Sequence, residues 1–176
     1  QDFEYDTSLR QTAVLEQARG EAGRVVERFK YGAADTVVGN QCGRLIRHDD
    51  PAGTRHMPEY DLLGLAQSEI SHFLTELDTP DWPLDESARD ALLESGVGLE
   101  TRWVYDPVGD LLSLVDAGGH RRRFGYTVAG QLKEGWLQPA NNPAPGQCLV
   151  HDIRYNPSNQ VERETAGNGV VTEAEY

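Results

Sequence analysis

The chain has 176 residues, and its 16 Lys and Arg against 29 Asp and Glu leave a formal net charge of −13. Apolar residues make up 38% of the chain, which suits one ordinary domain rather than a disordered segment, and 18 residues are glycine. The acidic surplus argues against nucleic acid as a partner, because phosphate binding needs a surplus of Lys and Arg. No apolar run approaches the roughly 18 residues of a membrane span, so we also expect no direct membrane insertion.

Residues 1–23 are expected to form a leading segment of strand and turn. The second half of this segment leaves two alternatives open. Ala13, Val14 and Leu15 fit either a helical turn or a strand that leads to a turn beginning at Gly20.

In the rest of the chain, glycines recur at regular spacings. From the origins Gly43, Gly109 and Asn159, a glycine follows ten residues later and a tyrosine seventeen residues later. Asn can take the place of Gly at an origin because it also tolerates a positive φ. The three copies define a repeat of about 21 residues, divided into halves of 10 and 11. We assign this repeat to residues 24–64 and again to residues 101–176.

Each half-repeat contains a predicted turn of the form Asp-x-x-Gly or a softer version of it. A type I turn favours Asp or Asn at its first position, accepts Pro at its second and favours Gly at its fourth. The Asp side chain can accept a hydrogen bond from the backbone two residues on, and Gly can adopt the left-handed conformation that closes the turn. The predicted structural turn residues are Asp50, Gly53, Asp61, Gly64, Asp106, Gly109, Asp116, Gly119, Gly130, Asn159 and Gly169.

A tyrosine recurs at the end of the predicted strands. Tyrosine suits a strand end, because its ring can be buried while its hydroxyl reaches a turn or water. We therefore expect these rings to pack against the next hairpin. The predicted repeat aromatics are Tyr60, Tyr105, Tyr126, Tyr155 and Tyr176.

An acidic insert is expected at residues 65–100, where the repeat is interrupted. Residues 81–83 give a helix-start signal, and residues 85–94 fit a short acidic helix that is closed by Gly96. An apolar stripe on one face of this helix is expected to dock on another part of the molecule. The residues of this stripe are Leu84, Ala88, Ala91 and Leu92.

A second interruption, at residues 138–147, is rich in Pro and Asn and is expected to be a loop; it includes Pro143 and Pro145. Elsewhere, turns recur every 10 or 11 residues with short strands between them, which indicates antiparallel hairpins in series. Isolated hairpins are marginal in water, so these units must pair edge to edge into a longer sheet. The predicted fold class is therefore mainly β, built from serial antiparallel hairpins with one short helical insert.

Clusters of side chains that could carry chemistry have simpler structural explanations. His48, Asp49 and Asp50 could bind a metal or move protons, but Asp50 already opens a turn and the other two lie on the preceding strand. His151 and Asp152 would point to opposite faces of a strand. We therefore predict no catalytic, cofactor-binding or metal-binding residue.

Two further features are interpreted in the same way. Residues 121–123 are three consecutive arginines, but strand alternation divides them between two faces, and we expect them to pair with carboxylates on neighbouring strands. Cys42 and Cys148 are too few for a disulfide framework and lack the spacing of a metal site, so free thiols are expected.

The turns and tyrosines resemble the Tyr-Asp (YD) repeats of RHS proteins, whose pattern runs Tyr-Asp-x-x-Gly-x-Leu. Residues 105–111, Tyr-Asp-Pro-Val-Gly-Asp-Leu, match this pattern closely. The order of further segments is similar to the C component of bacterial insecticidal toxin complexes (Tc toxins), and this similarity extends over residues 24–176. The segments that carry it are residues 27–31, 43–45, 47–53, 126–133, 136–137 and 167–172.

This resemblance implies a section of a large hollow β-shell that is shared with a B component and encloses a toxic payload. The implied partners are the rest of its own shell, the B component and the payload, and the implied location is a secreted complex that is made in the bacterial cytoplasm. The chain lacks an initial Met and stops in mid-repeat at Tyr176, so we expect a piece of a longer protein. The self-cleavage site and the toxic domain of the family would lie outside it, and this piece is not expected to be an enzyme.

Two other functions remain open at this stage. The repeats would also suit the RHS cage of a type VI or contact-dependent secretion effector, in which a different N-terminal region would be expected. A YD module that binds carbohydrate or a cell surface is the third possibility, and it would use exposed aromatics such as Trp82, Trp103 or Trp136.

Overall fold

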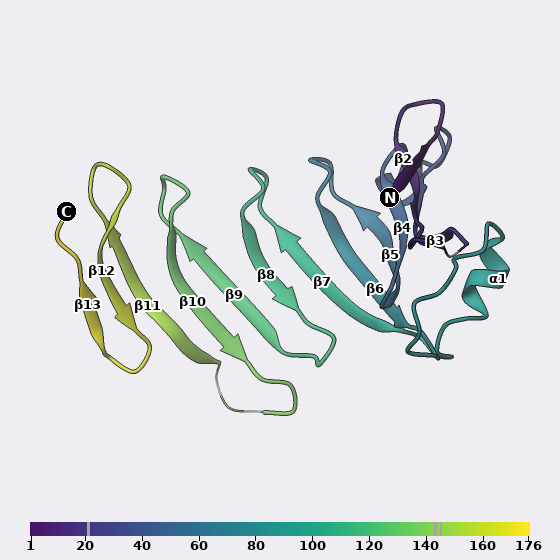
Figure 1. The fold of residues 1–176 in the computed structure, drawn as a ribbon. Coiled ribbons are helices and arrows are strands. Elements are labelled where there is room, and N and C mark those ends of the chain that lie inside the picture. The colour runs from purple at the N-terminus through teal and green to yellow at the C-terminus, as the bar shows by residue number, and fades with distance from the viewer. Residues whose placement is uncertain (21, 143, 145) are drawn as a thin grey trace. The chain divides into compact units, whose positions relative to one another are not determined.

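The structure is a computed structural model that describes residues 1–20, 22–142, 144 and 146–176. Pro143 and Pro145 of the predicted loop lie outside the described residues. The chain divides into two units, Gln1–Glu100 and Thr101–Tyr176 (Figure 1). No helix among the described residues is long and apolar enough to cross a membrane.

The first unit is a series of strands in which each strand pairs antiparallel with the next one along the chain. Its strands are β1 (Asp2–Tyr5), β2 (Gln11–Glu16), β3 (Arg24–Tyr31), β4 (Leu45–Asp50), β5 (Gly53–Tyr60) and β6 (Ala66–Phe73). A short 3₁₀ helix, η1 (Val38–Asn40), lies in the β3–β4 connection. The helix α1 (Glu86–Asp90) follows β6.

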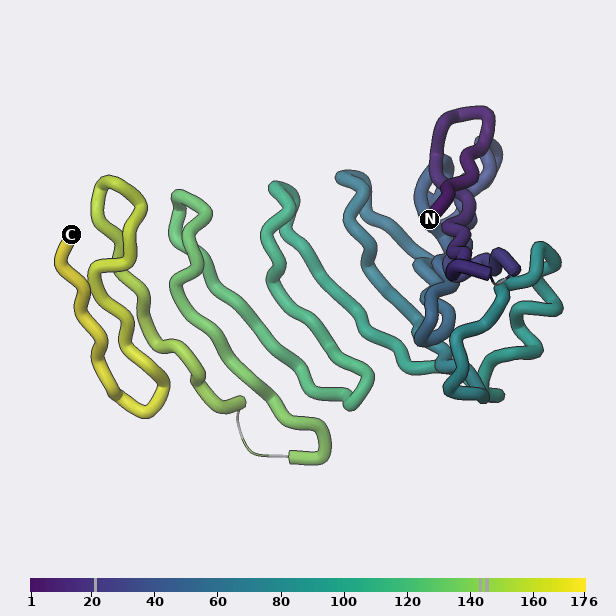
Figure 2. The backbone as a smooth tube through the Cα atoms, in the orientation of Figure 1, coloured from purple at the N-terminus to yellow at the C-terminus, as the bar shows by residue number. Residues whose placement is uncertain are grey.

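The second unit continues in the same manner, and its backbone runs back and forth between turns (Figure 2). Neighbours in sequence again pair antiparallel throughout the series. The strands are β7 (Leu99–Tyr105), β8 (Leu111–Val115), β9 (Arg121–Tyr126), β10 (Leu132–Gln138), β11 (Gln147–Tyr155), β12 (Val161–Ala166) and β13 (Val171–Glu173). The predicted fold class, serial antiparallel hairpins with one short helix, is confirmed.

The structure decides between the two alternatives for the segment before Gly20 in favour of a strand. Ala13 and Val14 of β2 are 0% and 3% exposed, and they pair with Arg28 and Glu27 of β3. Adjacent strand residues point to opposite faces of a sheet, so both faces of the sheet are covered at this point.

The interruption begins later than the expected boundary at residue 65. Residues Ala66–Phe73 form β6, which pairs with β5 from Tyr60 to Gly53. The inserted segment therefore consists of residues 74–98, and we call it the insert. The sequence of β6 is largely polar, and its strand character depends on the pairing with β5 rather than on an alternating apolar pattern.

The helix of the insert is shorter than expected, and its predicted docking stripe is wrong. Helix α1 spans five residues, with Asp85 as its N-cap accepting a hydrogen bond from the Ala88 amide at 2.9 Å. Of the predicted stripe, Leu84 is 82% exposed and Ala88 and Ala91 are also exposed. The buried residue of this helix is Arg89, so the helix docks through charge rather than through an apolar face.

Candidate functional site

The turn at Asp106 shows how the repeat closes each hairpin. The Asp106 amide donates to the carbonyl of Asp110 at 2.9 Å, and the Gly109 amide donates to the carbonyl of Asp106 at 3.1 Å. The Asp106 carboxylate accepts from the amides of Val108 and Asp110, both at 2.9 Å. Gly109 has φ +97°, the left-handed conformation that completes a type I turn with a bulge. The side chain thus supplies the turn with two hydrogen bonds.

The same pair of backbone hydrogen bonds recurs in six other turns of the two units. In each turn, the amide of the first residue donates to the carbonyl of the fifth. The amide of the fourth residue, which has a positive φ, donates to the carbonyl of the first. These turns open at Asp6, Asp61, Asp116, Thr127, Asn156 and Ala166, and their positive-φ residues are Leu9, Gly64, Gly119, Gly130, Asn159 and Gly169. The turn at Asp6 was not predicted, because Leu9 takes the place of glycine; the Tyr5-Asp6 pair was the signal that could have revealed it.

Asp50 and Gly53 form a tighter turn between β4 and β5. The Asp50 carboxylate accepts from the amides of Ala52 and Gly53 at 2.8 and 3.2 Å. Gly53 has φ +148°, and a Cβ at this position would lie 2.1 Å from the carbonyl oxygen of His72 on β6. Glycine is therefore required here both by the backbone conformation and by the close approach of the next strand.

The repeat tyrosines bridge neighbouring strands near the turns. In each bridge, a tyrosine hydroxyl donates to the carbonyl of the first residue of a preceding strand. The pairs are Tyr60 with Leu45, Tyr126 with Leu111 at 3.0 Å, Tyr155 with Leu132 at 2.7 Å and Tyr176 with Val161 at 3.2 Å. Burial raises the pKa of Tyr60 and of Tyr126. Tyr105 is the half-buried last residue of β7, directly before the turn at Asp106.

A buried ionic network lies beneath α1 in the first unit. Asp49 of β4 has a side chain that is 0% exposed. One of its oxygens accepts from Arg47 Nε at 2.7 Å and from Thr54 Oγ1 at 2.6 Å. The other oxygen accepts from Arg89 Nη1 of α1 at 2.8 Å. The carboxylate is therefore held by both the sheet and the insert.

Arg47 extends this network toward the surface. Its Nη1 donates to Asp90 of α1 at 2.6 Å and lies 3.5 Å from Glu86. Burial alone would lower the pKa of Arg47, but its hydrogen bonds to Asp49 and Asp90 outweigh that effect and raise it. Lys30 of β3 forms a further ion pair with Glu86 at 2.5 Å. Positive and negative side chains from the sheet and from α1 thus alternate through the network and neutralise one another.

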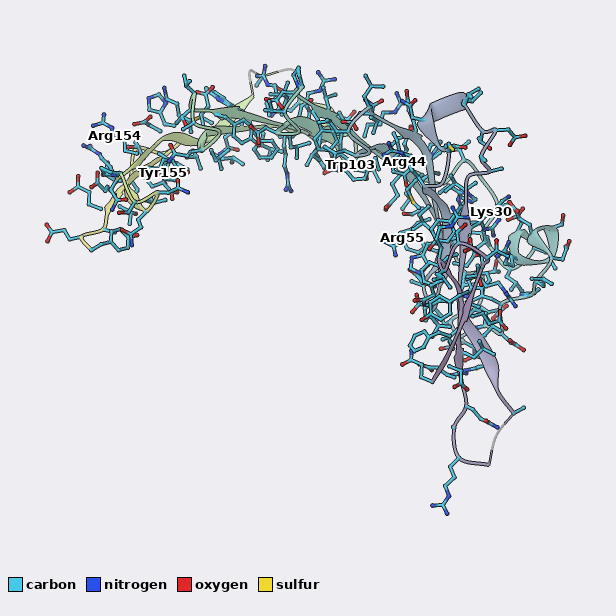
Figure 3. The ribbon with its side chains drawn as sticks, turned by 90° about the horizontal axis from the view of Figure 1, so that it is seen from above. Lys30, Arg44, Arg55, Trp103, Arg154 and Tyr155 are labelled. Carbon is cyan, nitrogen blue, oxygen red and sulfur yellow. The ribbon has the colours of Figure 1, made fainter. Side chains whose placement is uncertain are left out.

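Trp82 anchors the insert to β3. Its side chain is 1% exposed, and its amide donates to the carbonyl of Val25 at 2.9 Å. The Val25 amide donates to the Asp81 carboxylate at 2.8 Å, and Arg28 Nε donates to the Trp82 carbonyl at 2.8 Å. In Figure 3, Lys30 points toward α1, whereas Arg55 lies on the other side of this sheet and points away from α1. The insert therefore covers one face of the first unit.

The structure divides the cluster at His48 between the two faces of β4. His48 stacks on Phe29, with 4.4 Å between ring centroids. Its Nε2 lies 2.8 Å from Glu27 and its Nδ1 lies 2.6 Å from Arg55, whereas Asp49 belongs to the network beneath α1. Within the described ranges, no group of three or more His, Cys, Asp or Glu could hold a metal ion.

The prediction that residues 121–123 pair with carboxylates on neighbouring strands is wrong. The cross-strand neighbours of these arginines are Val115, Leu114 and Ser113 on one side and Gln138, Leu137 and Trp136 on the other. All three arginines are exposed, and none forms an ion pair within the part of the chain that the structure describes. Strand alternation was predictable, but the register that decides the neighbours was not.

The remaining candidates occupy different places. Asp152 forms an exposed ion pair with Arg154 at 3.1 Å, and His151 is exposed on β11. Cys42 is exposed and Cys148 half-buried, and both are free thiols. Sequence reasoning missed Arg47 and Arg89, the two cations that hold Asp49. The available signals were a charged pair two positions apart on β4, and a single base within an otherwise acidic helix.

No family model matches the chain. A curated relative, the toxin subunit YenC2 of Yersinia entomophaga, is 31% identical over 185 residues, which cover 99% of this chain and 19% of the relative. The chain therefore spans about a fifth of the length of that relative.

Solved structures agree with this relative in sequence and in fold. A crystal structure of TcdB2-TccC3-Cdc42 and the Tc holotoxin pore of Photorhabdus luminescens each match with a TM-score of 0.88 and 31% identity. Each match covers 99% of this chain and 8% of the solved chain. The resemblance to the C component of Tc toxins is confirmed. A crystal structure of TcdB2-TccC3 without its hypervariable C-terminal region matches equally well, with a TM-score of 0.88 and 30% identity.

Proposed function

We propose that this chain is a wall segment of a hollow RHS-repeat shell, which encloses a toxic payload in a secreted toxin complex. In this role it pairs with further hairpins of its own shell and with a B component, and it acts by containment rather than by catalysis. The similarity to Tc toxin proteins over 99% of the chain supports a toxin complex over a secretion effector.

The observation that carries this proposal is how little apolar surface the second unit buries. Seven strands pair in series, yet Ile153, which is 9% exposed, is the one large apolar residue that is buried among the residues described there. A sheet that buries so little apolar surface lacks the main driving force for folding. Its stability must therefore come from neighbours on its faces and edges, as in the wall of a larger assembly.

The strand edges support the same role. In the strand order, β1 and β13 each have one neighbour among the described strands. The free edge of such a strand presents unpaired N–H and C=O groups, which can pair with another strand. Further hairpins or a partner subunit would satisfy these groups.

A protease-protection experiment on the full-length protein with its B component tests containment. Phe124→Pro places a residue without an N–H in the middle of β9, a strand that is paired on both sides and in which Phe124 lies opposite Gly135 of β10. We expect it to open the wall and expose the payload to protease, whereas the native complex protects the payload.

Val128→Pro is the matched control. Val128 is fully exposed at the second position of a turn, the position that Pro107 and Pro157 occupy in other turns. Proline fits that position, so the payload should stay protected in this variant. Equal cleavage of the payload in the native complex and in Phe124→Pro would contradict the proposal.

A further inference from the structure

Two histidines lie beneath the insert, on the face of the first unit that α1 covers. His56 of β5 and His72 of β6 meet edge to face, with 5.7 Å between ring centroids. His72 pairs in register with Thr54, whose hydroxyl binds Asp49. The histidine pair is therefore continuous with the network that holds α1.

The end of the insert is seated directly on this pair. Gly98 has φ +75°, and a Cβ at this position would lie 2.6 Å from His72 Cε1 and 2.6 Å from Ile70 Cγ2. The Nδ1 atom of His72 is buried and has no hydrogen-bond partner among the described residues. A buried polar atom without a hydrogen-bond partner costs free energy, so the contact between the insert and His72 is not an optimal one.

Four groups from the surrounding elements act on His56. Arg47 and Asp49 come from β4, His72 from β6 and Asp90 from α1. Burial lowers the pKa of His56 most, and Arg47 and His72 lower it further, against smaller opposite effects of Asp49 and Asp90. The arrangement therefore favours a neutral His56.

We propose that the insert is an acid-sensitive strap, which loosens from the face of β3–β6 that it covers when His56 takes up a proton. A charge on His56 would repel Arg47, the residue that binds Asp90 and Glu86 of α1. Release of the strap would admit water to the histidines and relieve this repulsion. The exposed face would then be open to other contacts.

The strap yields before the sheet because fewer backbone hydrogen bonds hold it. The insert is joined to the sheet by isolated bonds, such as Trp82 to Val25 at 2.9 Å and Glu94 to Phe73 at 2.9 Å. Strands β3–β6 are joined along their lengths by continuous pairing. Local opening begins where the fewest such bonds must break.

The direction of the pH effect follows from the lowered pKa of His56. The pKa of His56 in the closed strap lies below the ordinary value of 6.5, so the preference for the closed strap is fully present above pH 6.5. This preference is lost progressively as the pH falls below 6.5 toward the lowered pKa. The pKa of Glu86 is lowered from 4.5 by its hydrogen bond to Lys30, so a mildly acidic buffer leaves that ion pair intact.

Hydrogen exchange of the full-length protein in its complex tests the strap at about pH 7.5 and about pH 5.5, which bracket histidine titration. After correction for intrinsic exchange rates, peptides from residues 81–98 should lose protection several-fold at the lower pH. Peptides from β3–β5 should keep theirs. Equal protection of the strap at both pH values would overturn the proposal without any variant.

The double variant His56→Gln, His72→Gln should remove the pH dependence, because glutamine does not titrate. His151→Gln, at an exposed site on β11, is the control and should retain it. Persistent pH dependence in the double variant would contradict the assignment to these histidines.

Gly98→Ala provides a second variant if the double variant disturbs β3–β5. Its Cβ would collide with His72, so the strap should exchange faster already at about pH 7.5, and acid should add less. Unchanged protection in Gly98→Ala would show that the strap is not seated on His72, and would overturn the proposal.

Discussion

The two units are built from the same hairpins but are stabilised differently. Seven apolar residues form the buried core of the described chain, and six of them belong to Gln1–Glu100. All of the buried polar residues of the described chain belong to this unit too. In Thr101–Tyr176 that core is reduced to Ile153. The first unit carries the insert, which covers one face of its sheet, and the second unit has no comparable cover among its described residues.

The difference shows that the repeat and the insert contribute separate things. The repeat supplies strands, turns and bridges from tyrosine hydroxyls, and these are present in both units. The insert supplies burial, which includes Trp82 and the pair Asp49–Arg89. The four predictions below test this distinction, from the largest expected effect to the smallest.

Removing the buried carboxylate should have the largest effect. Asp49→Ala leaves Arg47 and Arg89 buried without their shared partner, and breaking a buried ion pair in this way costs about 3–5 kcal/mol. We expect a corresponding loss in the free energy of unfolding of the first unit, measured by hydrogen exchange on the full-length protein.

Asp152→Ala is the matched control in the second unit. Its ion pair with Arg154 is exposed, with side-chain exposures of 28% and 66%, and such pairs contribute about 0–1 kcal/mol. Equal losses for the two variants would contradict the contrast between a covered and an uncovered sheet.

Glycine substitutions should separate close packing from backbone strain. Gly53→Ala places a Cβ 2.1 Å from a backbone oxygen of β6, and the clash and the positive φ together should cost about 2–4 kcal/mol. Gly169→Ala also has a positive φ, +85°, but no atom lies within 4 Å of its Cβ, and it should cost about 1–2 kcal/mol. Denaturant titrations of the two variants give the comparison, and a larger loss for Gly169→Ala would refute it.

The tyrosine bridges should contribute equally to the two units. Tyr60→Phe and Tyr126→Phe each remove a hydroxyl that donates to a strand carbonyl, which should cost about 0.5–1.5 kcal/mol. Tyr5→Phe is the control, because Tyr5 is 57% exposed and its hydroxyl has no partner within the described ranges. Thermal unfolding can rank the three variants. If Tyr5→Phe proves as costly as the others, the bridges do not stabilise the repeat.

The smallest effect is expected at the exposed end of the ionic network. Glu86→Gln removes the ion pair with Lys30, whose side chains are 43% and 45% exposed, and should cost about 0.2–1 kcal/mol near neutral pH. The pKa of Glu86 is lowered in the folded state, so its contribution is present above its ordinary value of 4.5 and is lost as the pH falls through the lowered value. The stability difference between native protein and variant should therefore vanish in acid, and a constant difference would argue against ion pairing.

The fold class was predictable because it depends on local rules that repeat. Asp at the first position and Gly at the fourth position of a turn act within four residues, and each copy reinforces the others. The turn at Asp6 escaped this rule because Leu9 adopts φ +60° without being glycine. Its conformation is imposed by hairpin pairing rather than by its own preference.

The network beneath α1 could not be predicted because it is nonlocal. Asp49 and Arg89 are 40 positions apart, and no periodic pattern relates them. The helix carries an apolar stripe in its sequence, yet five residues of α-helix are too short to present it on one face. Which face is buried was decided by the charges already present on β4.

The placement of this chain in a shell wall is tested most directly by electron cryo-microscopy of the full-length protein bound to its B component. We predict that strands β1–β13 are part of a closed β-wall, with both β1 and β13 paired to further strands and the payload inside. A map in which these strands form a separate domain outside a closed shell, with β13 unpaired, would contradict the account.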